Sequence, residues 1–212
     1  MTMLQRRPFI TRSLALGAAS ALPALAPRWA LAAASVGQPA PDFTLNDTAG
    51  QPVKLSQFKG KLVVLEWNNP GCPFVRKHYE GNMQGLHKEF TGKGVVWLAI
   101  NSTEDASSDY QTPPQLARWM RDKGASPSAA LMDEDGQVGA AYGARVTPHM
   151  YIVNAQGQLA YAGGIDSIPS ARVADIGKAT NFVRQGLGEL LAGKPVSTPT
   201  SQPYGCSIKY KS

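Results

Sequence analysis

Cys72 and Cys206 are the two thiols of this 212-residue chain, and Cys72 has the setting of a reactive one. It follows the turn-forming sequence Asn68–Gly71 and precedes Pro73, which suits the first position of a helix because its missing N–H costs nothing there. We therefore expect Cys72 at a helix N-cap, where exposed N–H groups and the helix dipole favour the nucleophilic thiolate. The alternative is a small buried side chain, the commonest fate of a free cysteine.

The residues around Cys72 predict a strand, a sharp loop and a helix. Lys61–Trp67 is a short apolar run rich in valine and leucine, as a buried parallel strand requires. After Cys72, apolar residues recur at spacings of three and four, which predicts one core-facing stripe formed by Val75, Tyr79, Met83, Leu86 and Phe90. Gly81 and Gly85 interrupt this helix and predict a kink or break.

Several ionisable side chains near this unit are expected to be solvated. His78 and His87 lie off the apolar stripe, and we expect neither to be a ligand. Glu66 is interpreted as an outward-facing residue of its strand, with a buried proton acceptor beside the cysteine as the alternative. Asp133–Gly136 lacks the spacing of a calcium loop and is interpreted as a solvated turn.

The rest of the chain predicts an α/β sandwich with a central mixed sheet. Strands are expected at 43–45, 53–55, 94–101, 129–132, 150–153 and 158–162, and helical segments from residue 113, at 137–142 and at 173–191. The Pro/Ser/Thr-rich segment 195–203 can extend to about 30 Å, enough to carry Cys206 across a small domain. We therefore divide the chain into a leader (1–34), one domain (35–194) and a tail (195–212) that carries Cys206.

The leader has the features of an export signal. Arg6 and Arg7 are followed by an aromatic and an aliphatic residue, Ser13–Pro27 is uncharged and rich in Ala and Leu, and small residues near position 32 suit cleavage. This resembles a twin-arginine signal and predicts a periplasmic protein, with an ordinary secretory signal as the alternative. Contact with a membrane is expected only through export or an uncleaved signal.

The basic net charge does not indicate a nucleic-acid partner. The formal charge of +6 includes four arginines among the first 34 residues, which contain no acid, so most of the excess belongs to the leader. In an oxidising compartment, the two cysteines are open to three interpretations: a structural bridge, a catalytic pair or two separate thiols.

These residues together resemble the thioredoxin-like redoxins, including the alkyl hydroperoxide reductase/thiol-specific antioxidant group. The resemblance covers residues 37 to 191 and is carried by Gly37–Phe43, Leu55–Trp67, Gly71–Lys77, Val146–Pro148 and Tyr151–Gly157, with a similar tail at Gly205–Lys209. It implies a thioredoxin-like α/β fold, with a central mixed sheet flanked by helices. It also implies a thiol oxidoreductase that reduces a peroxide or exchanges disulfides, is reset by a thioredoxin-like donor, and needs no cofactor or metal.

The resemblance assigns roles to five residues. Cys72 is the nucleophile, Cys206 resolves the intermediate through a disulfide, and Asn69 with the loop N–H groups binds the leaving oxygen or sulfur. Pro148, at the position of the thioredoxin cis-proline, shapes the substrate edge. Arg76 adds positive potential near Cys72, with an ordinary solvated helix charge as the alternative.

The chain departs from both family patterns. A thioredoxin would have a second cysteine three residues from Cys72, where Asn69 and Val75 stand. A peroxiredoxin would have Thr or Ser in place of Asn69 and Arg in place of Pro148. Two other interpretations therefore remain open: a copper-binding module using Cys72, His149 and Cys206, and a redox-inert protein with buried cysteines.

Overall fold

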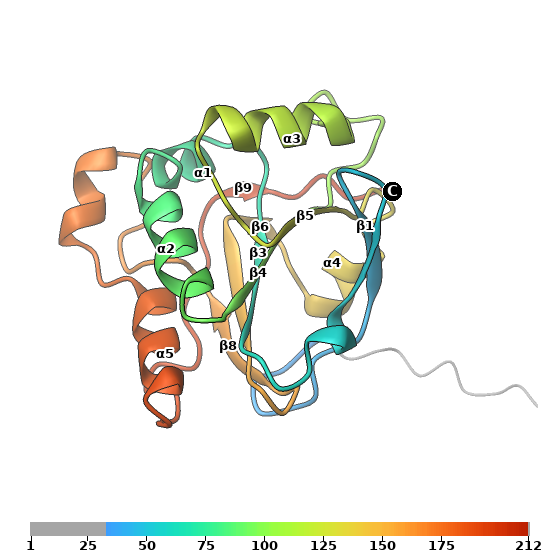
Figure 1. The fold of residues 1–212 in the computed structure, drawn as a ribbon. Coiled ribbons are helices and arrows are strands. Elements are labelled where there is room, and N and C mark those ends of the chain that lie inside the picture. The colour runs from blue at the N-terminus through green and yellow to red at the C-terminus, as the bar shows by residue number, and fades with distance from the viewer. Residues whose placement is uncertain (1–32, 212) are drawn as a thin grey trace, which may run out of the picture. The chain divides into compact units, whose positions relative to one another are not determined.

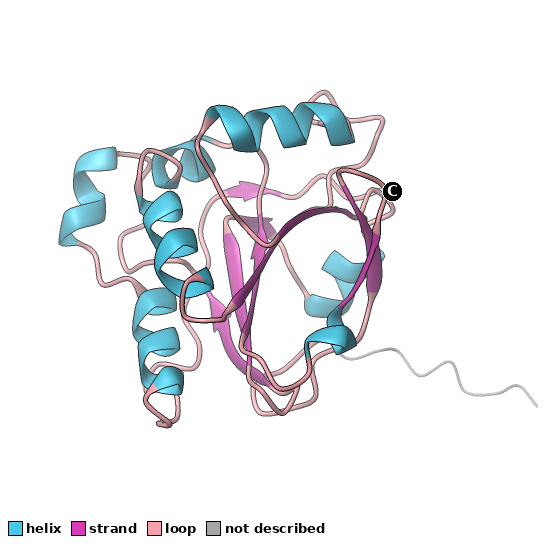
Figure 2. Ribbon diagram, viewed as in Figure 1, coloured by secondary structure: helices cyan, strands magenta, loops and turns pink. Residues whose placement is uncertain are grey.

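The computed structural model describes residues 33–211, so all but the last two residues of the predicted leader lie outside it. A seven-stranded sheet in the order β2-β1-β5-β4-β3-β7-β8 forms the centre of this region (Figures 1 and 2). β3, β4 and β5 run parallel and the other pairings are antiparallel, which confirms the predicted mixed sheet. Its strands are β1 (Thr44–Asp47), β2 (Pro52–Lys54), β3 (Val63–Trp67), β4 (Val96–Asn101), β5 (Ala129–Met132), β7 (His149–Val153) and β8 (Leu159–Gly163).

Helices cover both faces of the sheet. They are α1 (Pro73–His78), α2 (Asn82–Thr91), α3 (Pro113–Asp122), α4 (Gln137–Tyr142) and α5 (Phe182–Leu191), with 3-10 turns η1 (Leu55–Phe58) and η2 (Val173–Lys178). Figure 1 shows α2 and α5 on one side and α4 on the other. Alternate residues of β3 enter two separate cores, Val64 among the helices of the first side and Val63 with Leu65 toward α4.

Two helical predictions need correction at their boundaries. The predicted break falls at Gly81, whose φ of +114° ends the α1 unit and opens α2, whereas Gly85 lies inside α2. The expected single segment 173–191 is two elements, because Ala179 adopts an extended conformation. Asn181 then pairs with the backbone of Asp166 and caps α5 by accepting a hydrogen bond from the Arg184 N–H at 2.9 Å.

The expectation that His78, His87 and Glu66 face solvent is wrong, because all three are fully buried. β3 is covered on both faces, so it offers no outward position to Glu66. The Glu66 carboxylate accepts hydrogen bonds of 2.7 Å from Tyr79 Oη and Trp97 Nε1. It lies 3.5 Å from His87 Nε2, and these partners together hold the Glu66 pKa below its usual range despite burial.

Asp133 also departs from its prediction as part of a solvated turn. Its side chain is buried and accepts hydrogen bonds from Ser102 Oγ at 2.5 Å, Val138 N at 3.1 Å and Gly139 N at 2.9 Å. The carboxylate therefore satisfies the free N–H groups at the start of α4. Burial nevertheless raises the Asp133 pKa.

A separate two-stranded ribbon joins the tail to the domain. β9 (Cys206–Ser207) pairs antiparallel with β6 (Val146–Thr147), the short strand that precedes β7. Of the helices in residues 33–211, none is both long and apolar enough to cross a bilayer.

Candidate active site

Cys72 occupies the helix N-cap that the sequence predicts. It has extended backbone angles and Pro73 is the first residue of α1. The Cys72 N–H closes the preceding turn by donating to Asn69 O at 3.0 Å. The side chain is only 3% exposed, and the thiol Sγ donates to Thr147 O at 3.1 Å. The cysteine is thus both buried and positioned by polar contacts.

Asn69 shapes the loop before Cys72. Its Oδ1 accepts a hydrogen bond from Gly71 N at 2.7 Å, and its Nδ2 donates to Thr103 Oγ1 at 2.8 Å and to Asp109 O at 3.3 Å. Both ends of the amide are therefore engaged by the protein. Asn69 lies at the predicted site, but its contacts position the loop rather than leave the amide free for a leaving group.

Pro148 directly follows Thr147, the residue whose carbonyl oxygen contacts Cys72. The Thr147–Pro148 peptide bond is cis, and the Thr147 carbonyl oxygen accepts the hydrogen bond from the Cys72 thiol. Thr147 is also the β6 residue that pairs with Cys206. One backbone position therefore contacts both cysteines, from sequence segments that are far apart.

Cys206 arrives at the site on a tail fastened at both ends. On one side, Thr200 bridges Ala162 of β8, and on the other Ile208 N donates to Arg145 O at 3.0 Å. Between them, Gly205 approaches the cis peptide closely. Any Cβ at Gly205 would overlap Thr147 O and lie 2.6 Å from the Thr147 carbonyl carbon, so this approach requires glycine.

Both thiols line one small cavity of about 40 Å³, together with Asn69, Thr103 and Asp109. Both cysteines are free thiols. Burial, and then the hydrogen bond with Cys72 and the charge that Cys72 carries when ionised, raise the Cys206 pKa to about 12.

Arg76 does not contact either sulfur. It is exposed on α1 and its Nε donates to Pro70 O at 2.7 Å, so it braces the loop that precedes Cys72. A fixed positive charge remains one helical turn beyond the cysteine, but the contact itself is structural.

His149 is turned toward the domain interior. It is buried, its Nδ1 lies 3.3 Å from Tyr151 Oη, and burial lowers its pKa to about 4. Across residues 33–211, no three His, Cys, Asp or Glu side chains gather as a possible metal-binding group. The copper-binding set of Cys72, His149 and Cys206 thus gains no support from the geometry.

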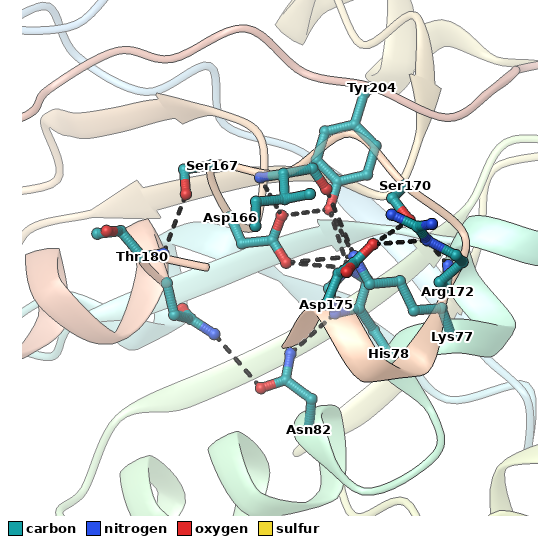
Figure 3. A network of polar contacts seen from close by, with 12 residues as sticks. Lys77, His78, Asn82, Asp166, Ser167, Ser170, Arg172, Asp175, Thr180 and Tyr204 are labelled. Atoms are coloured by element: carbon teal, nitrogen blue, oxygen red, sulfur yellow. Dashed lines mark hydrogen bonds and ion pairs between the residues drawn. The ribbon is translucent and has the colours of Figure 1, made fainter. Parts of the chain in front are cut away.

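A buried polar cluster beside the site has no signal in the sequence. Lys77 and His78 of α1 meet Asp166, from the loop after β8, and Tyr204 of the tail (Figure 3). The members are separated by up to 127 positions, so neither periodicity nor a local motif joins them. Tyr204 lies two residues before Cys206, and Lys77 and His78 lie on the helix that follows Cys72, so the cluster is linked to both thiols.

Comparison with known proteins identifies the family to which this chain belongs. Residues 36–162 match the AhpC/TSA family. Thiol-disulfide oxidoreductase ResA of Bacillus subtilis is 30% identical over 125 residues, which are 59% of this chain and 65% of ResA. The chain therefore spans slightly less than two thirds of the length of that relative.

Solved structures are similar to the domain as a whole. An uncharacterized conserved protein from Geobacillus kaustophilus has a TM-score of 0.75 and 30% identity, covering 84% of this chain and 93% of its own. This coverage is larger than the family match, so the similarity continues beyond residue 162. The thioredoxin domain of a thiol-disulfide oxidoreductase from Bacteroides vulgatus, with TM-score 0.50, 22% identity and coverage of 60% and 87%, confirms the thioredoxin-like fold.

Proposed function

The chain belongs to the AhpC/TSA family, and we propose that it is an extracytoplasmic thiol-disulfide oxidoreductase whose redox couple is Cys72 and Cys206. The observation that carries the proposal is the shared cavity, in which a thiol at a helix N-cap faces a second thiol held by the β6–β9 pairing. The name of the ResA relative supports the same class of reaction.

The proposed reaction transfers two electrons from the chain to a substrate disulfide. The Cys72 thiolate attacks one substrate sulfur, the other leaves as a thiolate and takes a proton, and a mixed disulfide remains. The Cys206 thiol then loses its proton and attacks Cys72 Sγ, which releases the second substrate thiol and leaves a Cys72–Cys206 disulfide. A thioredoxin-like dithiol donor returns two electrons and two protons to reset the chain.

The raised Cys206 pKa orders these two steps. While Cys72 is a thiolate, its charge and hydrogen bond help to keep Cys206 protonated, so Cys72 attacks first. Once Cys72 is part of a mixed disulfide it carries no charge, and that contribution to the Cys206 pKa disappears. Cys206 becomes easier to ionise at the step in which it must act.

The contacts around Cys72 favour disulfide exchange over peroxide reduction. Asn69 replaces the hydroxyl residue of a peroxiredoxin and its amide is occupied by Gly71, Thr103 and Asp109. The Arg76 Nε is directed to Pro70 O. The Thr103 hydroxyl that lines the cavity is paired with Asn69 Nδ2, and the Arg76 guanidinium is not held against the thiol.

The mass of the intact protein tests the couple directly. Reduced protein without the leader is given one equivalent of oxidised glutathione, and in parallel one equivalent of hydrogen peroxide. We expect a loss of about two mass units, absent in Cys72→Ser and Cys206→Ser, because a disulfide forms with loss of two hydrogens. A glutathione adduct or sulfenic acid on Cys72 that persists in the wild-type chain would refute Cys206 as its partner.

Substrate preference is measured on the same variants. We expect reduction of a model peptide disulfide, coupled to thioredoxin, to exceed peroxide consumption and to be lost in Cys72→Ser. Equal rates for wild type and Cys72→Ser would refute the nucleophile assignment.

Export is proposed from the leader alone. Replacing Arg6 and Arg7 by lysine in the full chain is expected to retain the protein in the cytoplasm if the twin-arginine route is used. Fractionation that shows unchanged export would instead indicate the ordinary secretory route.

A further inference from the structure

The docked tail both completes the proposed site and covers it. Cys72 is 3% exposed and the cavity beside it measures about 40 Å³, which is room for a water molecule but not for a polypeptide disulfide. Substrate attack therefore needs the segment around Cys206 to leave, and resolution needs it to return. The contacts that hold this segment near Cys206 therefore affect both steps of the proposed reaction, the attack of Cys72 on the substrate and the attack of Cys206 on the mixed disulfide.

Tyr204 holds the tail through contacts with the ionisable side chains of Asp166, His78 and Lys77 (Figure 3). Its hydroxyl donates to Asp166 Oδ1 at 2.5 Å and lies 3.1 Å from His78 Nε2. Lys77 Nζ lies 3.5 Å from the same hydroxyl and 5.6 Å from the centre of the Tyr204 ring. The ring also packs edge-on against Phe74, with centroids 5.8 Å apart.

The cluster is built into the interior rather than onto the surface. The Lys77 side chain is fully buried and the Asp166 side chain is 3% exposed, and their charged atoms are 3.5 Å apart. A buried ion pair is tolerated only when further hydrogen bonds satisfy it, and the Tyr204 hydroxyl accepts one from Lys77 and donates one to Asp166. His78 completes the cluster by contacting Asn82 Nδ2 through Nδ1 at 2.9 Å.

The geometry connects this cluster to both reacting sulfurs. Lys77 and His78 lie on α1, the helix that begins directly after Cys72. Tyr204 precedes Cys206 by two residues, with only Gly205 between them. A tyrosine hydroxyl thus fixes the short segment that carries one thiol to the helix that carries the other.

We propose that Tyr204 is the positioning residue of the redox couple, and that its hydroxyl bond to Asp166 holds Cys206 against Cys72 and limits access of substrate to Cys72. This rests on the proposed function, in which Cys206 is the partner of Cys72. Tyr204 itself touches no reacting atom. Its effect is on how much of the time the tail is docked.

Alkylation of Cys206 measures tail release. In the Cys72→Ser background, Cys206 is the remaining thiol, and its thiolate forms readily only when the tail leaves the burial that raises its pKa. Tyr204→Phe keeps the ring against Phe74 and removes the hydroxyl. We expect Cys206 to be alkylated about ten to a hundred times faster, as loss of a hydrogen bond to a charged group implies.

Tyr210→Phe is the matched control in the same tail. Tyr210 Oη donates to a neutral acceptor, Ala144 O, at 2.7 Å, and its ring lies against Gly136 and Gly139. Removing this hydroxyl is expected to change the alkylation rate several-fold less than removing that of Tyr204. Equal effects of the two variants, or no effect of Tyr204→Phe, would refute a special role for Tyr204.

A redox equilibrium separates positioning from a merely structural contact. With both cysteines present, the dithiol and oxidised glutathione exchange to give the protein disulfide and two glutathione thiols. We expect Tyr204→Phe to lower the effective concentration of the Cys72–Cys206 pair by up to the factor by which it speeds alkylation of Cys206. Tyr210→Phe should change this effective concentration less. Faster alkylation with an unchanged equilibrium would overturn the positioning role.

The two proposals fail in different ways. If wild type forms no Cys72–Cys206 disulfide while Tyr204→Phe still releases Cys206, the redox couple is wrong and the fastening stands. If wild type forms the disulfide and Tyr204→Phe changes neither measurement, the couple stands and the role of Tyr204 is wrong.

Discussion

Gly205→Ala is the sharpest perturbation of the docked tail. Gly205 has a φ of +143°, a backbone conformation that favours glycine. A methyl group there would overlap Thr147 O and lie 2.6 Å from the Thr147 carbonyl carbon and 3.2 Å from Pro148 N. All three atoms belong to the backbone, so no side-chain rotation relieves the overlap and β9 must move away from β6.

The cost has two parts. The unfavourable φ contributes about 1 kcal/mol, and loss of the backbone pairing between β6 and β9 contributes about 1 to 3 kcal/mol. Together they disfavour the docked tail by about 2 to 4 kcal/mol, a factor of roughly 30 to 1000 in its equilibrium constant. The β6–β9 ribbon is separate from the seven-stranded sheet, so we expect the unfolding midpoint to change little.

The assay compares Gly205→Ala with Gly60→Ala. Gly60 also has a positive φ, +88°, but a Cβ there meets nothing within 4 Å, so this control contains the conformational cost without the overlap. We expect the effective concentration of the Cys72–Cys206 pair to fall sharply in Gly205→Ala and to stay at the wild-type value in Gly60→Ala. A wild-type equilibrium in Gly205→Ala would show that Cys206 does not need the β6–β9 pairing to reach Cys72.

The remaining predictions concern the groups that support the site. Burial lowers the His78 pKa from 6.5 to about 4, so the unfolded chain binds a proton that the folded chain rejects, and stability falls as pH drops from 6.5 to 4. His78 contributes about 3 kcal/mol to this loss at pH 4, and urea unfolding should show a shallower pH dependence for His78→Gln; an unchanged slope would contradict the burial argument. Lys77→Met leaves the buried Asp166 carboxylate without its cation and should cost about 3 to 5 kcal/mol in urea unfolding, with partial recovery when Asp166→Asn is added; strict additivity would contradict the pairing. Asn69→Ala leaves Gly71 N–H without its acceptor, so it should lower the free energy of unfolding by about 1 to 3 kcal/mol and slow formation of the Cys72–Cys206 disulfide. A wild-type rate of disulfide formation would show that the loop keeps its conformation without the Asn69 side chain.

The sequence predicts what local periodicity determines. The strands around Leu65 and Leu98 are continuous apolar runs, and each becomes a central parallel strand because both faces of the sheet are covered. The turn before Cys72 and Pro73 after it likewise determine the N-cap, because turn and helix-start preferences act over a few residues.

Burial of polar groups could not be predicted in this way. His78 lies off the apolar stripe of its helix, which normally means solvent, but Asp166 and Tyr204 from distant segments cover it. Glu66 similarly lies in a strand where alternation would turn it outward, but no residue of that strand is exposed. In both cases the covering partner is set by tertiary packing, and a single sequence carries no record of which distant residue will be the neighbour.

The position of Cys206 lies between these cases. The length of the tail permits contact with Cys72, but the same length permits many other positions, so reach alone predicts nothing about docking. What selects the site is a set of specific fits: a glycine where a side chain would overlap the cis peptide, a β6 backbone free to pair, and a tyrosine beside a buried ion pair.

A partner thiol on a docked tail differs physically from one fixed in a Cys-x-x-Cys turn. In the turn, the spacing of the two sulfurs is set by the helix that carries them, so changing their equilibrium means changing the nucleophile's own surroundings. Here Cys72 is positioned by Asn69 and Thr147, whereas Cys206 is positioned by contacts of Gly205 and Tyr204. The stability of the disulfide then depends on the fraction of time that the tail is docked. Substitutions in the tail should therefore weaken the Cys72–Cys206 disulfide in proportion to tail release. The rate at which Cys72 attacks a small disulfide, measured with Cys206→Ser, should rise across the same tail variants, because the docked tail covers Cys72.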